Sequence, residues 1–336
     1  MESNPSESIC VYGAGVLVRH IDALAKEVEG VRSGSEDIEY IHKARVASRR
    51  LRSALPLFQS CLPRKKQKSW LKEIKAVTRA LGAARDADVQ IDRLAKLAAD
   101  LPDKRCKPGL DRLMLRLRQT RASLQPGVDE AMQLLLHDLT LDEMRAHLQP
   151  LAERQSRVYL YTPALYQHAF GAISTCLDDF LSYESIIDQP EKIAELHAMR
   201  ISAKWLRYSM ENLAALYSNG LKDELQVIRK VQETLGSIHD HDVWIEFLPR
   251  FLQEERERTL SYYGNLRMFH RLVAGIEYFL QDCTETRARY YREFLGDWQR
   301  WKDKAIWQNL REQIQSPFFK LIPFAEAEDA ENKPAQ

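Results

Sequence analysis

The stretch HKARVASRRLRSALPLF at residues 42–58 decides the fold, because a second version of it, HAMRISAKWLRYSMENL, occurs at residues 197–213. Each copy is followed by a shorter paired motif, LGAARDADV at residues 81–89 and LGSIHDHDV at residues 235–243. The long motifs align at an offset of 155 residues (197 against 42), and the short motifs align at 154 (235 against 81). Many identities in the same order at a nearly constant offset indicate a tandem duplication, with the join near residue 155.

The duplication predicts an all-α protein with two tandem helical-bundle repeats related by pseudo-two-fold symmetry. We divide the chain into residues 1–155 and 156–320, followed by an acidic, frayed tail at residues 321–336. Only 13 of the 336 residues are Gly and 13 are Pro, which is below average usage, and nearly every segment has the helical period. The expected helices run near residues 12–30, 36–60, 66–82, 84–100, 109–125, 128–148, 160–185, 190–217, 221–235, 239–256, 262–283 and 285–315.

The repeated motif places its basic residues on one face of a helix. At 100° per residue, the basic side chains of the first copy fall within one narrow arc, opposite a stripe of apolar side chains. The second copy repeats this arc, and the helix that follows the first copy adds another. These three sets are His42, Arg45, Arg49 and Arg52; His197, Arg200, Lys204 and Arg207; and Lys68, Lys72, Lys75 and Arg79.

A solvated helix face is the ordinary explanation for a run of charges, but the composition here differs from such a face. Solvated faces mix acids and bases, because like charges at i,i+4 repel by a few tenths of a kcal/mol. The segment from His42 to Asp88 contains 13 Lys and Arg against 3 Asp and Glu. Since the stripe is also duplicated, we interpret it as a surface that binds a polyanion.

The paired motifs resemble those of the conserved histidine α-helical domain (CHAD) family. The resemblance covers about residues 9–315. It implies two four-helix-type bundles around a central basic channel, and binding of inorganic polyphosphate without turnover. Together with the basic stripes, it gives the candidate polyphosphate-binding residues: His42, Arg45, Arg49, Arg50, Arg52, Lys72, Lys75, Arg79, His197, Arg200, Lys204, Arg207, Arg229 and Lys230. Arg offers a fork that meets two phosphate oxygens, and Lys adds a mobile point charge.

The second copy departs from the first. Trp205 stands where the first copy has Arg50, while Gln226 and Glu233 replace the equivalents of Lys72 and Arg79. From His197 to Val243 the chain has 6 Lys and Arg against 6 Asp and Glu. We therefore expect the second half of the channel to be weaker and the site to be lopsided towards the first repeat.

The charge of the whole chain conceals this stripe. It contains 49 Lys and Arg against 48 Asp and Glu, a formal charge of +1, which taken alone argues against a polyanion-binding protein. The first-repeat segment is balanced by acidic stretches elsewhere. We expect a cationic surface inside a channel and a mixed exterior.

Two other partners or activities compete with polyphosphate. The string His239-Asp240-His241-Asp242 is typical of an HD-type, metal-dependent phosphohydrolase, but the first copy has no histidine at this place. We favour a structural role in which Asp240 and Asp242 cap a helix that begins after Gly236. Non-specific nucleic-acid binding is a weaker alternative, because the first stripe has no interleaved aromatic residues to stack on bases.

The remaining features predict neither a cofactor nor a membrane partner. There is no glycine-rich phosphate loop, no HExxH and no zinc-like ligand spacing, so we expect a protein that is not an enzyme and binds no metal. The five cysteines are odd in number and widely spaced, so no disulfide framework is expected and a reducing cytoplasm is predicted. Within the cytoplasm, polyphosphate binding would target the protein to polyphosphate granules. The longest apolar run, Ile9 to Val18, is too short to span a bilayer.

Overall fold

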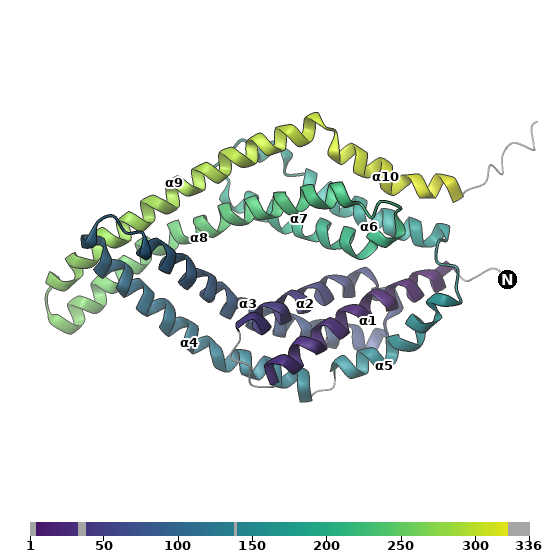
Figure 1. The fold of residues 1–336 in the computed structure, drawn as a ribbon, viewed down its shortest axis with the longest axis horizontal. Helices are drawn as coiled ribbons and strands as arrows, with labels where there is room; N and C mark the ends of the chain where they lie inside the picture. The colour runs from purple at the N-terminus through teal and green to yellow at the C-terminus, as the bar shows by residue number, and fades with distance from the viewer. Residues whose placement is uncertain (1–4, 33–37, 138–139, 322–336) are drawn as a thin grey trace, which may run out of the picture.

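The computed structural model describes residues 5–32, 38–137 and 140–321, and these residues form an all-α fold without strands (Figure 1). The first half supplies α1 (Pro5–Arg32), α2 (Ile38–Leu57), α3 (Arg64–Ala99), α4 (Lys107–His137) and α5 (Thr140–Ala152). The second half supplies α6 (Pro163–Leu181), α7 (Ile193–Leu213), α8 (Lys222–Tyr263), α9 (Arg267–Asp303) and α10 (Ile306–Leu321). The all-α prediction is confirmed. The predicted acidic tail lies outside the described residues from residue 322 onwards.

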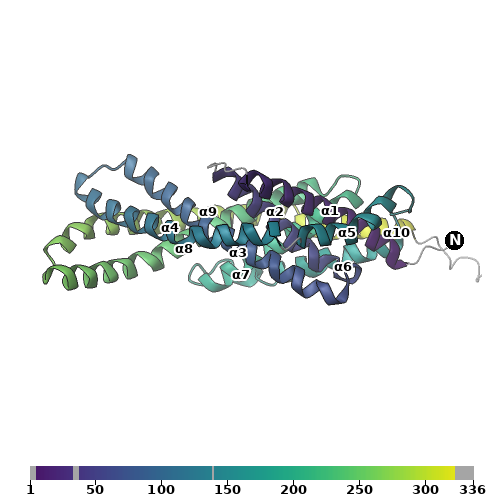
Figure 2. The ribbon, with the colours of Figure 1, turned by 90° about the horizontal axis from the view of Figure 1, so that it is seen from below.

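Helices at equivalent places in the two halves pack against each other. These pairs are α1 with α6, α2 with α7, and α4 with α9. Within the halves, α3 with α4 and α8 with α9 form long hairpins that extend to the same end of the molecule (Figures 1 and 2). This is the packing that a two-fold relation between the halves produces, and the symmetry itself stays a prediction.

Two hydrophobic cores hold these helices together. The larger one combines first-half residues such as Leu51 and Ile74 with second-half residues such as Leu206. The smaller one lies between the two hairpins and includes Leu113 and Phe279. Because both cores draw on both halves, burial of apolar side chains, worth roughly 1.5–3 kcal/mol each, stabilises the assembly of the halves as well as each half. The C-terminal aromatic residues Tyr291, Phe294, Trp298, Trp301 and Trp307 are buried in the larger core, and Tyr290 is partly buried against it.

Four helix breaks predicted from the sequence do not exist. The segments 66–82 and 84–100 form the single helix α3, and 221–235 and 239–256 lie within the single helix α8. The helix α4 also continues through the predicted break at residues 126–127, and α9 continues through the one at residue 284. Gly82 and Gly236 occupy helix interiors, where glycine costs about 1 kcal/mol relative to alanine but does not end the helix. The prediction failed because glycine was interpreted as punctuation, whereas these two glycines face neighbouring arginines.

The α4 and α9 helices approach each other closely at two other glycines. A Cβ atom on Gly109 would overlap the carbonyl oxygen of Leu272, and one on Gly275 would overlap the carbonyl oxygen of Cys106. Only residues without a Cβ permit this backbone contact. The crossing fixes the angle between the two hairpins and therefore the position of the end of the molecule that they form.

The expectation that the cysteines form no disulfide is wrong. Cys10 of α1 is bonded to Cys61, which ends the short 3-10 turn after α2, and their Cα atoms are 5.1 Å apart. Sequence spacing concealed the pair because 51 residues separate them. Among the described residues, Cys106, Cys176 and Cys283 are free. The argument from cysteine spacing to a reducing compartment therefore fails, and the cytoplasmic location stays an untested prediction.

The N-terminal helix is longer and more apolar than the short run Ile9 to Val18 indicated. Residues Ser6–Val28 of α1 are long and apolar enough to cross a membrane by length and composition, although 61% of the most apolar window is buried inside the protein. Val11, Leu17 and Ile21 are fully buried against the other helices. A core helix gives the same pattern, and the predicted absence of a membrane partner stays untested.

Candidate functional site

The basic stripes of the two long motifs come together where α2 packs against α7. Six cationic side chains influence one another's charge there, three from each helix. We call them the α2–α7 basic cluster: Arg45, Arg49, Arg52, Arg200, Lys204 and Arg207. The structure thus brings together residues that lie 155 positions apart in the sequence and occupy equivalent places in the two long motifs.

Burial and neighbouring positive charges lower the pKa values of two members of this cluster. Burial, and then the neighbouring Arg200, Arg49, Arg52 and Arg45, lower the pKa of Lys204 to about 8. Burial lowers the pKa of Arg49 as well, and further cations of the cluster act in the same direction. The protein therefore holds these positive charges against both desolvation and mutual repulsion, which an anion in contact with them would relieve.

The ring of Tyr208 partly offsets the repulsion. The guanidinium carbon of Arg49 lies 5.4 Å from the ring centre and that of Arg207 lies 6.0 Å from it. A cation near an aromatic face is stabilised by the ring's quadrupole. We did not predict a role for Tyr208 from the sequence, although it directly follows Arg207 in the second motif.

The two glycines of the short motifs lie beside the first arginine of each long motif. A Cβ atom on Gly82 would lie 3.9 Å from Nε of Arg45, and a Cβ atom on Gly236 would lie 3.7 Å from Nε of Arg200, which are ordinary contact distances. The same glycine–arginine neighbourhood therefore occurs in both halves. It joins the long motif to the short motif in each half.

Several polar atoms of the site have no partner within the described part of the chain. They are Nε of Arg49, Nε of Arg52 and Nδ1 of His42, all buried. Among the described residues, no ion pair involves Arg49, Arg52, Arg200 or Lys204, and Arg45 has only a long contact with Asp86, at 3.4 Å. Buried donors are usually satisfied, so these groups are available to an anion or to water.

The cations of the second half are more often neutralised. Glu211 accepts hydrogen bonds from both Arg207, at 2.9 Å, and Arg229, at 3.1 Å. Lys230 pairs with Glu293 of α9 at 2.6 Å and therefore does not join the cluster. This pairing supports the expectation that the site is lopsided towards the first repeat.

The other first-half candidates lie on α2 and on the neighbouring helix α3. His42 and Arg50 line a pocket of about 300 Å³ between α1 and α2. Lys72, Lys75 and Arg79 are exposed on α3 and form no ion pair among the described residues. These three cations lie outside the α2–α7 basic cluster.

His197 contacts a histidine that the motif comparison left outside the binding site. Its Nδ1 atom lies 3.0 Å from Nδ1 of His239 on α8, so one ring donates and the other accepts. Burial, followed by the charge of His197 and of Arg200, lowers the pKa of His239 to about 4. Burial also lowers the pKa of His197, as do Arg200 and Lys204. A polyanion beside the pair would favour its protonation.

Three residues of the string His239-Asp240-His241-Asp242 have different partners, namely His239, His241 and Asp242. His241 is 2.5 Å from the carbonyl oxygen of Ser237 through Nδ1, which must donate, and its Nε2 accepts from Arg93 at 2.6 Å. Among the described residues, no group of three or more His, Cys, Asp or Glu is arranged to hold a metal ion. The geometry gives the HD-type interpretation no ligand set in this part of the chain.

The predicted capping role of Asp240 and Asp242 is wrong, because both lie in the middle of α8. The buried Asp242 pairs instead with Arg287 of α9. At the equivalent place in the first half, Asp88 of α3 pairs with Arg121 of α4 at 2.7 Å. The last aspartate of each short motif therefore ties the two helices of a hairpin together.

Comparison with known proteins shows what the chain resembles. A model of the CHAD domain family matches residues 15–249. The crystal structure of the CHAD domain from the plant Ricinus communis has 22% sequence identity and a TM-score of 0.54, with 86% of this chain and 92% of that chain covered. PptA from Streptomyces chartreusis has 14% identity and a TM-score of 0.57, with 88% of this chain and 100% of that chain covered. At these identities the likeness to solved structures shows the fold alone. No curated protein sequence matches the chain.

Proposed function

The chain belongs to the CHAD family, and from this premise we propose that it binds inorganic polyphosphate at the α2–α7 basic cluster without turning it over. The observation that carries the proposal is the cluster of six cations from two helices, in which burial and then the neighbouring arginines lower the pKa of Lys204 to about 8. Such crowding is unfavourable in the free protein. A ligand that places several negative charges among these side chains relieves the repulsion between the cations, and this gain tightens its binding.

A linear phosphate polymer fits the arrangement of the cations. The arginines on α2 recur every three or four residues, so their guanidinium groups follow one helix face and present successive forks. Arg200 and Lys204 supply charge from the opposing helix α7. In this proposal a long chain also reaches the exposed Lys72, Lys75 and Arg79 of the neighbouring helix α3, which gives it more contacts than a single phosphate.

The described residues favour polyphosphate over nucleic acid. Single-strand binding without sequence preference relies on exposed aromatic rings on which bases stack. The aromatic ring in contact with the basic cluster is Tyr208, and it is buried. A base has no exposed platform at Tyr208, whereas phosphates need only the guanidinium and ammonium groups.

The divergence of His239, His241 and Asp242 supports binding without catalysis. Each of these side chains is engaged by a different residue, namely His197, Arg93 and Arg287. A hydrolase of the HD type needs them convergent on a metal that activates water. Incubation of the protein with polyphosphate and a divalent metal, followed by a phosphate-release assay, tests this part of the proposal, and metal-dependent release of phosphate contradicts it.

The binding proposal is tested by changing Arg45, Arg49 and Arg52 together to Ala. We expect affinity for a long polyphosphate to fall at least 100-fold, because several charge-assisted hydrogen bonds of roughly 1.5–3 kcal/mol each are lost. Wild-type affinity should fall steeply with added salt as counterions are released. Calorimetric titration at two salt concentrations measures both effects.

A matched control separates the loss of these three arginines from a general loss of positive charge. Arg118, Arg256 and Arg292 are exposed, lie on α4, α8 and α9, and form no ion pair among the described residues. Their triple change to Ala removes the same three charges and should leave affinity within about twofold, since distant exposed charges are screened. Equal losses in the two triple variants, with helical circular dichroism intact, would place the site elsewhere.

A further inference from the structure

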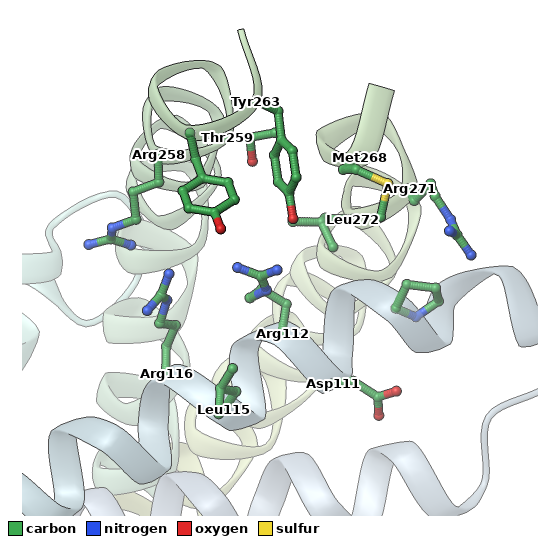
Figure 3. A pocket seen from close by; sticks show the side chains of 12 residues that line it. Asp111, Arg112, Leu115, Arg116, Arg258, Thr259, Tyr263, Met268, Arg271 and Leu272 are labelled. Atoms are coloured by element: carbon green, nitrogen blue, oxygen red, sulfur yellow. The ribbon is translucent and has the colours of Figure 1, made fainter. Parts of the chain in front are cut away.

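A second cationic site lies at the end of the molecule formed by the two hairpins. A pocket of about 660 Å³ opens there between the start of α4, the end of α8 and the start of α9 (Figure 3). Four arginines line it: Arg112, Arg116, Arg258 and Arg271. None of its lining residues belongs to α2 or α7, so this pocket is separate from the α2–α7 basic cluster.

A buried carboxylate fixes three of these arginines in place. Glu255 is 0% exposed and accepts hydrogen bonds from Arg116 at 2.7 Å, from Arg258 at 2.7 Å and from Arg112 at 3.1 Å. Burial raises the pKa of Glu255, but the hydrogen bonds from Arg116 and Arg258 outweigh it and hold the pKa low. In Figure 3 the guanidinium groups of Arg112, Arg116 and Arg258 are directed toward a common space.

The charges around the pocket do not cancel. Glu255 compensates one of the three arginines that it holds, and Glu254 forms an exposed pair with Arg258 at 3.0 Å. Asp111, an acidic residue that lines the pocket, forms an ion pair with Lys107 at 2.7 Å. Arg271 is exposed and has no ion pair within the described residues. Positive charge therefore remains at both ends of the pocket.

The rest of the wall is aromatic and apolar, and much of it is open to solvent. Tyr262 is 82% exposed and Tyr263 is 53% exposed, and their ring centres are 4.7 Å apart. Leu115 and Met268 are exposed beside them. Large exposed apolar side chains gathered at one place mark a binding surface more often than scattered ones do. A planar ring would cover the tyrosines, while an anionic group on the same ligand would reach the guanidinium forks.

From this pairing of preorganised arginines with exposed tyrosines around one pocket, we propose that the end of the hairpins binds a small, multiply charged anion that carries an aromatic ring, of the kind that a nucleotide presents. The volume lies in the range of small-ligand sites, about 300–1,000 Å³. The arginines bind the charged end of the ligand and the tyrosine side of the pocket binds the ring.

The test is calorimetric titration of the full chain with ATP, with tripolyphosphate and with adenosine. ATP carries both charge and ring, whereas tripolyphosphate has no ring and adenosine has no charge. We expect ATP to bind about tenfold more tightly than tripolyphosphate and far more tightly than adenosine. The measurement is repeated in the Arg45, Arg49 and Arg52 to Ala variant, which removes competing phosphate binding at the basic cluster, and ATP affinity there should be retained.

Two sets of variants locate the site. Tyr262→Ala combined with Arg271→Gln removes two exposed side chains that touch neither Glu255 nor a hydrophobic core, and we expect ATP affinity to fall about tenfold or more with the melting temperature unchanged. Arg112→Gln should also weaken ATP, while Glu255 keeps two arginine partners. Unchanged ATP affinity in the double variant overturns the proposal, as does loss of ATP binding in the basic-cluster variant or equal affinity for ATP and tripolyphosphate. Each of these outcomes leaves the polyphosphate proposal to its own test.

Discussion

Arg49 of the first half lies over the ring of Tyr208 in the second half, with 5.4 Å between the guanidinium carbon and the ring centre. The contact joins α2 to α7 at the point where their basic faces meet. A buried guanidinium without an ion pair is costly, and the ring supplies part of the missing stabilisation without neutralising the charge. The positive charge of Arg49 thus stays available to a ligand.

Changing Tyr208 tests this contact. Tyr208→Leu removes the ring and should weaken polyphosphate binding roughly threefold to tenfold, since a cation–π contact is worth about 0.5–2 kcal/mol. Tyr208→Phe keeps the ring, and because the Tyr208 hydroxyl is buried without a partner in the described part of the chain, it should bind as the wild type does and be at least as stable. The comparison is made by calorimetric titration and thermal melting. Equal affinity in the Leu and Phe variants would show that the ring serves packing alone.

The lowered pKa of Lys204 predicts a pH dependence of binding. Its pKa is about 8 in the free protein, so the side chain loses its charge as pH rises from 7 to 9.5. A polyanion binds the charged form better and raises the pKa in the complex, so affinity should fall as pH rises through 8. Titrations at pH 7, 8 and 9.5 and constant salt measure the slope. Lys204→Arg stays charged throughout this range and should flatten the profile, and an unchanged profile would assign the titration to another group.

The sequence predicted the helical class, because that class follows from periodicity. The two-fold relation between the repeats, inferred from an identity pattern at one offset, stays a prediction. The sequence did not predict that α3 and α8 run through Gly82 and Gly236, since glycine ends some helices and lies within others according to what packs beside it. Here the neighbours are Arg45 and Arg200, which only the tertiary structure places there.

The partners of individual side chains could not be predicted from the sequence either. The family resemblance assigned Lys230 to the binding surface, but Lys230 forms an ion pair with Glu293 of α9, 63 residues away. The pocket around Glu255 was missed because its arginines are divided between α4, α8 and α9 and follow no local motif. Residues brought together from separate helices leave no spacing signal in a single sequence.

The glycines predict two opposite effects on stability. Gly275→Ala places a methyl group against the backbone of Cys106 and should lower the free energy of unfolding by about 1–3 kcal/mol, the usual cost of overpacking. In Gly82→Ala the added Cβ atom meets only Nε of Arg45, at an ordinary contact distance of 3.9 Å. This variant should raise the free energy of unfolding by about 0.5–1 kcal/mol, because alanine favours the helix. Thermal melting of the two variants side by side measures the difference. Stabilisation by Gly275→Ala would contradict the close crossing of α4 and α9.

The Asp242–Arg287 pair should matter for stability and not for ligand binding. Asp242→Asn leaves Arg287, whose side chain is only 14% exposed, without its carboxylate and should cost roughly 2–4 kcal/mol, as broken buried ion pairs do. The effect is measured by chemical denaturation, and polyphosphate affinity of the folded variant should stay within about twofold. Asp240→Asn in the same short motif is the matched control, since Asp240 is exposed, and it should change stability little. A large loss of affinity in the Asp242 variant would move this motif into the binding site.

The Cys10–Cys61 bond predicts a redox dependence of stability. It closes a segment of 51 residues between α1 and the turn after α2. Loop-closure entropy for such a segment corresponds to roughly 4 kcal/mol of stabilisation, and the stabilisation that disulfides provide is often smaller than this value. Cys61→Ser should lower the melting temperature, and a reducing agent should lower that of the wild type to a similar value. Cys176→Ser is the control, because Cys176 is free, and its melting temperature should still fall when reductant is added. The bond is verified by mass spectrometry. Equal melting temperatures of the oxidised and the reduced wild type would then contradict the prediction that the disulfide stabilises the fold.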